Sequence, residues 1–166
     1  LVGSEMCIRD RIWTAYRMDD TEAQRLVTDL TSTGDAPLQA LETLEKFDDE
    51  RMLDVDKAWH ALERLYKQAH APSPISEGRV PDSEDVVVGH VTPARVTAIA
   101  AAMGRITPSI LRKGYDAKKF TRDEIYPDIW DEDDVLDVYV MPYDAELREF
   151  YAKAAEADEA VIWQLN

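Results

Sequence analysis

Three short segments rich in aromatic and β-branched residues constrain the fold more than any other feature of this chain. They cover residues 12–18, 86–91 and 160–165, near the start, the middle and the end of the 166 residues. Such composition is typical of strands, and the stretches between the segments repeat their apolar residues at helical spacing. The chain is therefore predicted to be an α+β (mixed α/β) protein, in which a small sheet is covered by about five helices. The first and last strands are expected to be neighbours in the sheet.

Capping signals mark where several of the helices begin. Asp19 and Glu22 form a start similar to a capping box. The pairs 92–93 and 107–108 each place a threonine before a proline, which suits the first helical position. Helices are expected to begin near residues 19, 35, 54, 92, 107 and 142, with a loop over residues 70–85 and irregular structure over residues 115–134.

One predicted helix, over residues 54–69, combines an apolar stripe with a polar face that carries candidate catalytic groups. Asp54 is the expected N-cap, and Trp59 falls on the stripe, where it is expected to belong to the core. His60 falls nearly opposite the stripe, with Asp56 one turn before it. A carboxylate that orients a histidine suits a general base or a metal ligand, so His60 and Asp56 are the catalytic candidates. The simpler interpretation of His60 is an exposed histidine in a surface pair, and a buried histidine in a second packing layer is a further alternative.

Residues 126–134 join a tyrosine and a tryptophan to five carboxylates. Carboxylate oxygens can bind Mg²⁺ or Ca²⁺, but the segment lacks the glycine and the regular alternation of an EF-hand loop. A helix N-terminus or a solvated face is the simpler interpretation of these acids. The aromatic side chains are expected to pack onto the helix that begins at Asp54, because a loop of this length needs apolar anchors. The candidate binding residues are Trp59, Asp128, Trp130, Asp131, Asp133 and Asp134.

The chain is strongly acidic, with 34 acidic residues against 19 lysines and arginines and a formal net charge of −15. This charge repels nucleic acids and anionic membranes, so the predicted partner is a basic protein. Cys7 is the only cysteine, which leaves residues 11–166 without a thiol and favours a cytoplasmic location. No apolar run reaches the roughly 18 residues that a transmembrane helix needs.

Residues 1–10, LVGSEMCIRD, resemble the translation of a sequencing adapter more than the start of a domain. They lack the basic start and the apolar stretch of a signal peptide. We therefore expect residues 11–166 to form a single domain, and residues 1–10 to make few contacts with its core.

Several separate segments agree in sequence and spacing with one bacterial family. The matching segments are LDVDKAWHAL at residues 53–62, Gly89-His90 before Thr92-Pro93, residues 126–134, ELREFY at residues 146–151, and the final apolar strand. Together they resemble the YfbM-like proteins, a family built around a domain of unknown function, over essentially residues 11–166. The resemblance implies a compact α/β protein and no catalytic residues. The chain departs from the family pattern at its start, where the usual methionine is missing, and between residues 68 and 84.

No motif in the sequence identifies an enzyme class. A nucleophile elbow, a glycine-rich phosphate loop and a dinucleotide-binding pattern are all absent from it. The leading hypothesis is a non-enzymatic protein-binding module, comparable to the small acidic immunity proteins that mask a basic toxin or nuclease. The alternative is an enzyme or a divalent-metal-binding protein that uses Asp56, His60 and the carboxylates of residues 128–134. No cofactor and no metal ligand is predicted, and the oligomeric state is left open.

Overall fold

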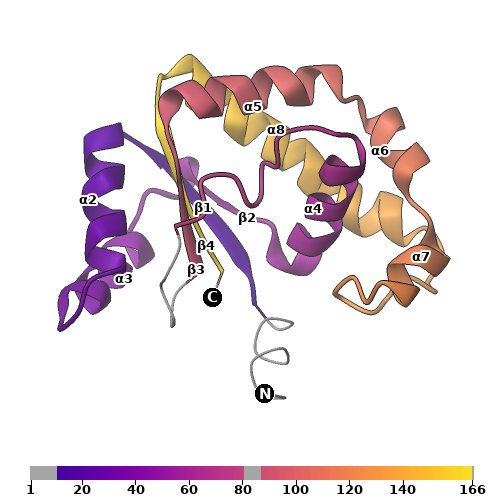
Figure 1. The fold of residues 1–166 in the computed structure, drawn as a ribbon, viewed down its shortest axis with the longest axis horizontal. Helices are drawn as coiled ribbons and strands as arrows, with labels where there is room; N and C mark the ends of the chain where they lie inside the picture. The colour runs from indigo at the N-terminus through magenta and orange to yellow at the C-terminus, as the bar shows by residue number, and fades with distance from the viewer. Residues whose placement is uncertain (1–10, 81–86, 166) are drawn as a thin grey trace.

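The computed structural model describes residues 11–80 and 87–165, which form one sheet with helices on both faces (Figure 1). Residues 1–10 lie outside the described part of the chain, and so does the end of the predicted loop over residues 70–85. None of the described helices is long and apolar enough to cross a membrane.

In chain order the elements are β1 (Trp13–Met18), α2 (Asp20–Leu30), α3 (Ala36–Glu45), the 3-10 helix η1 (Asp49–Arg51), β2 (Met52–Asp54), the 3-10 helix η2 (Asp56–Ala58), α4 (Trp59–Gln68), β3 (Val87–Val91), α5 (Pro93–Arg105), α6 (Pro108–Gly114), α7 (Ala117–Arg122), the π-helix η3 (Leu136–Val140), α8 (Met141–Glu156) and β4 (Ala160–Leu165).

The sheet has four strands in the order β2-β1-β4-β3, and every pair is antiparallel. β1 and β4 lie at its centre, with Thr14 opposite Gln164, which confirms that the first and last strands are neighbours. The edge strand β2 is not predicted from the sequence, because three residues are too few to show an alternating pattern. The α+β fold class is confirmed, with seven α-helices in the described residues instead of about five.

Both faces of the sheet are covered, so the strand residues alternate between two cores. On one face, Tyr16 and Ile162 pack with the buried residues of α2 and α3. On the other face, Trp13 and Trp163 stack with their ring centroids 6.5 Å apart and join the larger core with α4, α5 and α8. Figure 1 shows α2 and α3 on one side of the strands and α4 to α8 on the other. This double burial explains why the central strands carry apolar residues on both of their faces.

The predicted helix starts are confirmed at the three strongest capping signals. The Asp19 side chain accepts hydrogen bonds from the backbone N–H groups of Thr21 (2.9 Å) and Glu22 (3.4 Å), and α2 begins at the next residue. A proline occupies the first turn of α5, after Thr92, and of α6, after Thr107. Local side-chain chemistry is therefore sufficient to place these three helices.

The helix predicted from Asp54 begins only at Trp59. Asp54 is the last residue of β2, and its side chain accepts a 2.6 Å hydrogen bond from the backbone N–H of Asp56. Asp56 itself has a left-handed backbone with φ 49° and begins η2. The prediction of Asp54 as a helix N-cap is wrong, because the same side-chain bond closes a turn at the end of a strand.

Residues 115–134 are predicted to be irregular, but they contain the short helix α7. Its N-cap is Asp116, whose side chain accepts a 3.1 Å hydrogen bond from the backbone N–H of Lys119. The helix predicted from Pro142 begins one residue earlier, at Met141, as α8. Its inner residues tie it to α4 and α5 on the larger core.

Residues 69–80 form an irregular stretch after α4, as predicted. Buried aromatic side chains hold this stretch against the core through hydrogen bonds to its backbone carbonyls. Such bonds satisfy the buried indole N–H and tyrosine hydroxyl donors as well as the carbonyl acceptors of the loop. The loop is therefore ordered without secondary structure of its own. The three bonds run from Trp13 Nε1 to the carbonyl of Ile75 (3.0 Å), from the Tyr151 hydroxyl to that of Pro74 (2.7 Å) and from Trp163 Nε1 to that of Glu77 (2.8 Å).

Candidate functional site

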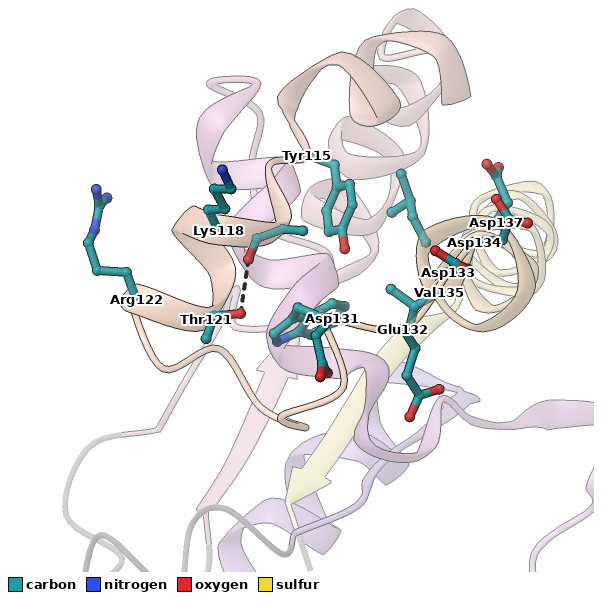
Figure 2. A pocket seen from close by; sticks show the side chains of 13 residues that line it. Tyr115, Lys118, Thr121, Arg122, Asp131, Glu132, Asp133, Asp134, Val135 and Asp137 are labelled. Carbon is teal, nitrogen blue, oxygen red and sulfur yellow. Dashed lines mark hydrogen bonds between the residues drawn. The ribbon is translucent and has the colours of Figure 1, made fainter.

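A groove of about 780 Å³ lies between α7 and the stretch that leads into η3. We call residues 126–139 the acidic segment, because they include six carboxylates and no lysine or arginine. α7 lines one side of the groove and the acidic segment lines the other (Figure 2). Apolar surface comes from Tyr115, Trp130, Val135 and Leu136. A groove of this size, with apolar and charged walls, can take several side chains of another molecule.

Four consecutive carboxylates, those of residues 131–134, are exposed at the groove. Within residues 11–80 and 87–165, no salt bridge or side-chain hydrogen bond engages any of the four. Asp137, by contrast, accepts a 2.7 Å bond from Arg112 of α6. Adjacent like charges repel one another, so a cationic group bound here would relieve that repulsion.

Trp130 anchors the middle of the acidic segment in the core. Its side chain is 1% exposed, and its Nε1 donates a hydrogen bond to the carbonyl of Ile125. The ring meets Phe120 of α7 edge-on, with centroids 5.0 Å apart, and lies 6.1 Å from the ring of Tyr115. The tryptophan therefore sets the acidic segment against α7, and it also contributes to the lining of the groove.

α7 brings basic residues to the opposite side of the groove. Lys118 and Arg122 line it together with Thr121, and Figure 2 shows both basic side chains pointing away from the acidic segment. Sequence reasoning missed this side because it did not predict α7. A sharp change of charge marks it nevertheless: residues 105–122 include six basic residues and one acid, and residues 123–137 include eight acids and no base.

The two catalytic candidates, Asp56 and His60, have separate hydrogen-bond partners. Asp56 Oδ2 accepts from the Tyr139 hydroxyl at 2.9 Å, and His60 Nδ1 accepts from the Tyr126 backbone N–H at 3.0 Å. The His60 ring is partly buried and stacks on Trp59, with centroids 5.0 Å apart. The predicted surface pair requires one α-helix through both residues, but α4 begins only after Asp56. Tyr126 makes the expected contact between residues 126–134 and this part of the chain, through its backbone N–H to His60 and through its ring, whose centroid lies 5.5 Å from Lys57 Nζ.

Two further candidates lie outside the groove. Trp59 is 9% exposed, and its Nε1 donates to the carbonyl of Arg11 at 2.9 Å, in keeping with the core position expected for it. Asp128 is exposed and lines a smaller hollow of about 140 Å³, next to Tyr126. The candidates that the structure brings together at the groove are Trp130, Asp131, Asp133 and Asp134.

Metal coordination by protein oxygens needs several ligands that converge on one point. In the described part of the chain, no three histidine, cysteine, aspartate or glutamate side chains are grouped so that they could hold a metal ion. What the acidic segment offers is a negative potential along one side of the groove.

Comparisons with known proteins identify a fold and a family. A search of curated proteins finds no match. The crystal structure of YfbM, a protein of unknown function from Escherichia coli, is similar over 93% of this chain and 99% of that chain, with a TM-score of 0.69 and 18% sequence identity. At this identity the similarity establishes a shared fold. The resemblance to the YfbM-like proteins is confirmed by a family model, described as a domain of unknown function (DUF1877), which matches residues 11–164, and the chain therefore belongs to the DUF1877 family.

Proposed function

We propose that this chain is a non-enzymatic protein-binding module, and that its groove takes a basic segment of a partner protein. One observation carries the proposal: a single groove combines apolar surface with four carboxylates that have no ion pair among the described residues. Lysine and arginine side chains suit such a groove, because their alkyl stems can lie on apolar surface while their charged ends meet the carboxylates.

The charge of the whole chain supports the same kind of partner. A net charge of −15 attracts a basic protein. Dissolved ions limit the range of this attraction to a screening length of about 8 Å at physiological ionic strength. An immunity-like role, in which a cytoplasmic bacterial protein masks a basic toxin or nuclease, fits this charge balance. We expect the same field to repel nucleic acids and anionic membranes.

The alternative, an enzyme or a divalent-metal-binding protein, requires His60, Asp56 and the carboxylates of residues 128–134 to converge in one cleft. The contacts described above direct His60 and Asp56 to different partners, and neither residue lines the groove. No observation in the described residues therefore favours the alternative over protein binding.

Replacing Asp131, Asp133 and Asp134 together by asparagine should weaken the binding of a short amidated peptide of alternating lysine and leucine. The Kd is expected to rise about tenfold, because several exposed ion pairs, each of about 0.2 to 1 kcal/mol, are removed together. Asparagine keeps the size of the side chain and suits the left-handed backbone of Asp134, whose φ is 57°. Fluorescence anisotropy measures the affinity, and stopped-flow mixing should show an association rate that falls as salt is added.

A matched variant removes the same number of charges far from the groove. It carries Asp35→Asn, Glu42→Gln and Glu156→Gln, all at exposed positions. This variant should bind the peptide almost as tightly as the unmodified chain, and a peptide with glutamate in place of lysine should not bind. Equal losses in the two triple variants would show that net charge alone attracts the peptide, which contradicts a role for the groove.

A further inference from the structure

Asp56 and His60 contact the two ends of the acidic segment. His60 Nδ1 accepts the hydrogen bond of the first residue, Tyr126, and Asp56 Oδ2 accepts that of the last, Tyr139. The two acceptors lie four residues apart in the chain, Asp56 in η2 and His60 in the first turn of α4. One part of the chain therefore holds two points that are separated by the whole acidic segment.

The acidic segment needs such attachments because its charges oppose an ordered conformation. Its six carboxylates repel one another, and the segment contains no basic residue of its own. Trp130 fixes the middle of the segment in the core. If the two ends were released, the carboxylates of residues 131–134 would no longer keep a fixed distance from α7, and the groove would change its width.

The chemistry of both contacts suits a lasting attachment. An imidazole nitrogen accepts a hydrogen bond only through a free lone pair, so the Nδ1 atom of His60 carries no proton and the ring proton of the neutral histidine is on Nε2. The Asp56 carboxylate is an acceptor for the Tyr139 hydroxyl. Burial, and after it the hydrogen bond to Asp56, raise the pKa of Tyr139, which keeps this hydroxyl protonated as a donor.

We infer that Asp56 and His60 are positioning residues that clamp the two ends of the acidic segment and thereby set the width of the groove. The effect on binding rests on the function proposed for the groove, whereas the clamp itself needs no ligand. The inference also explains why two polar groups and a tryptophan occur together in residues 56–60, since Trp59 attaches this part of the chain to the carbonyl of Arg11 next to β1.

Hydrogen exchange tests the His60 end of the clamp without a ligand. His60→Ala removes the acceptor and should speed exchange of the Tyr126 amide about tenfold, with faster exchange in residues 130–135 as well. The amides of β4 should keep their rates. His60→Asn should restore slow exchange, because the asparagine Oδ1 can take the place of Nδ1 and accept the bond. Unchanged exchange at Tyr126 in His60→Ala, or equal acceleration throughout β4, would overturn the inference.

A pair of variants isolates the Asp56 end. Asp56→Gly keeps the left-handed backbone but removes the acceptor, whereas Asp56→Asn keeps both. Exchange in residues 136–140 should rise in the glycine variant and stay slow in the asparagine variant. In both, the pKa of Tyr139 should fall with the loss of the negative charge and remain above its ordinary value, because burial is the larger cause. Identical exchange in the two variants would contradict a clamp at this end.

Peptide binding then separates the clamp from the proposed function. The Kd of the lysine and leucine peptide should rise in His60→Ala and return in His60→Asn, while the melting temperatures of the two variants stay similar. If exchange responds as expected but the peptide binds none of the proteins, the proposed function fails and the clamp stands. If exchange responds and the peptide binds every variant equally, the clamp does not set the groove, and that part of the inference is overturned.

Discussion

Gly89→Ala should lower the free energy of unfolding by about 3 kcal/mol, because overpacking costs roughly 1 to 3 kcal/mol and a lost hydrogen bond about 1 more. A Cβ atom on Gly89 would lie 2.1 Å from Cε2 of Trp163, the residue opposite it in the β3 and β4 pair. The Trp163 ring is 1% exposed and donates a hydrogen bond to the carbonyl of Glu77, so it cannot move aside without losing that bond. Denaturation with urea measures the change.

Gly104→Ala is the matched control for this substitution. Gly104 lies within α5, and nothing lies within 4 Å of the position of its Cβ atom. Alanine should therefore stabilise the helix, by up to about 1 kcal/mol. A Gly89→Ala variant as stable as the unmodified chain would contradict the packing of the Trp163 ring on β3.

Asp144→Ala should have an effect of similar size, about 3 kcal/mol or more, because it leaves a buried hydroxyl without its acceptor and a guanidinium without its carboxylate partner. The Asp144 side chain is 1% exposed and accepts from the Tyr66 hydroxyl at 2.6 Å and from Arg148 Nε at 2.7 Å. Arg148 also donates to the carbonyls of Met103 and Ile106, so this network joins α4, the end of α5 and α8. Calorimetry should show a clear fall in melting temperature.

Two control variants separate the buried network from ordinary loss of charge. Glu149→Ala removes an exposed carboxylate that pairs with Lys153 on the same helix, and it should leave the melting temperature nearly unchanged. Tyr66→Phe removes one donor but leaves Asp144 its bond to Arg148, so its cost should be smaller than that of Asp144→Ala. An Asp144→Ala variant as stable as Glu149→Ala would show that the network does not support the fold.

The fold was predictable wherever a local signal decides the structure. Asp19 and the two pairs of threonine and proline mark helix starts by chemistry within one turn, and the apolar runs of β1, β3 and β4 are long enough to be distinctive. Where one local signal has two outcomes, prediction failed: Asp54 can cap a helix or close a turn, and its pairing with Thr14 across the sheet decides between them. Register and strand order depend on such distant contacts.

The candidate site was predictable as a composition but not as a geometry. The acids of residues 131–134 and the tryptophan beside them were identified from the sequence, and they line the groove. The other side of the groove depends on α7, whose six residues have no clear apolar stripe. The relation between Asp56 and His60 was predicted for a continuous helix, and the left-handed backbone at Asp56 cannot be derived from side-chain spacing. Their tyrosine partners lie far along the chain, where no pattern indicates them.

The most direct test of the central claim is the place where the basic peptide binds. A titration of the isotopically labelled chain with the lysine and leucine peptide, followed by amide chemical shifts in NMR spectra, reports that place. We expect saturable shifts in residues 115–122 and 130–137, the two sides of the groove, and small shifts in α2 and α3. Shifts concentrated on α2 and α3, or spread evenly over the acidic surface without saturation, would contradict the groove as a binding site for a basic partner.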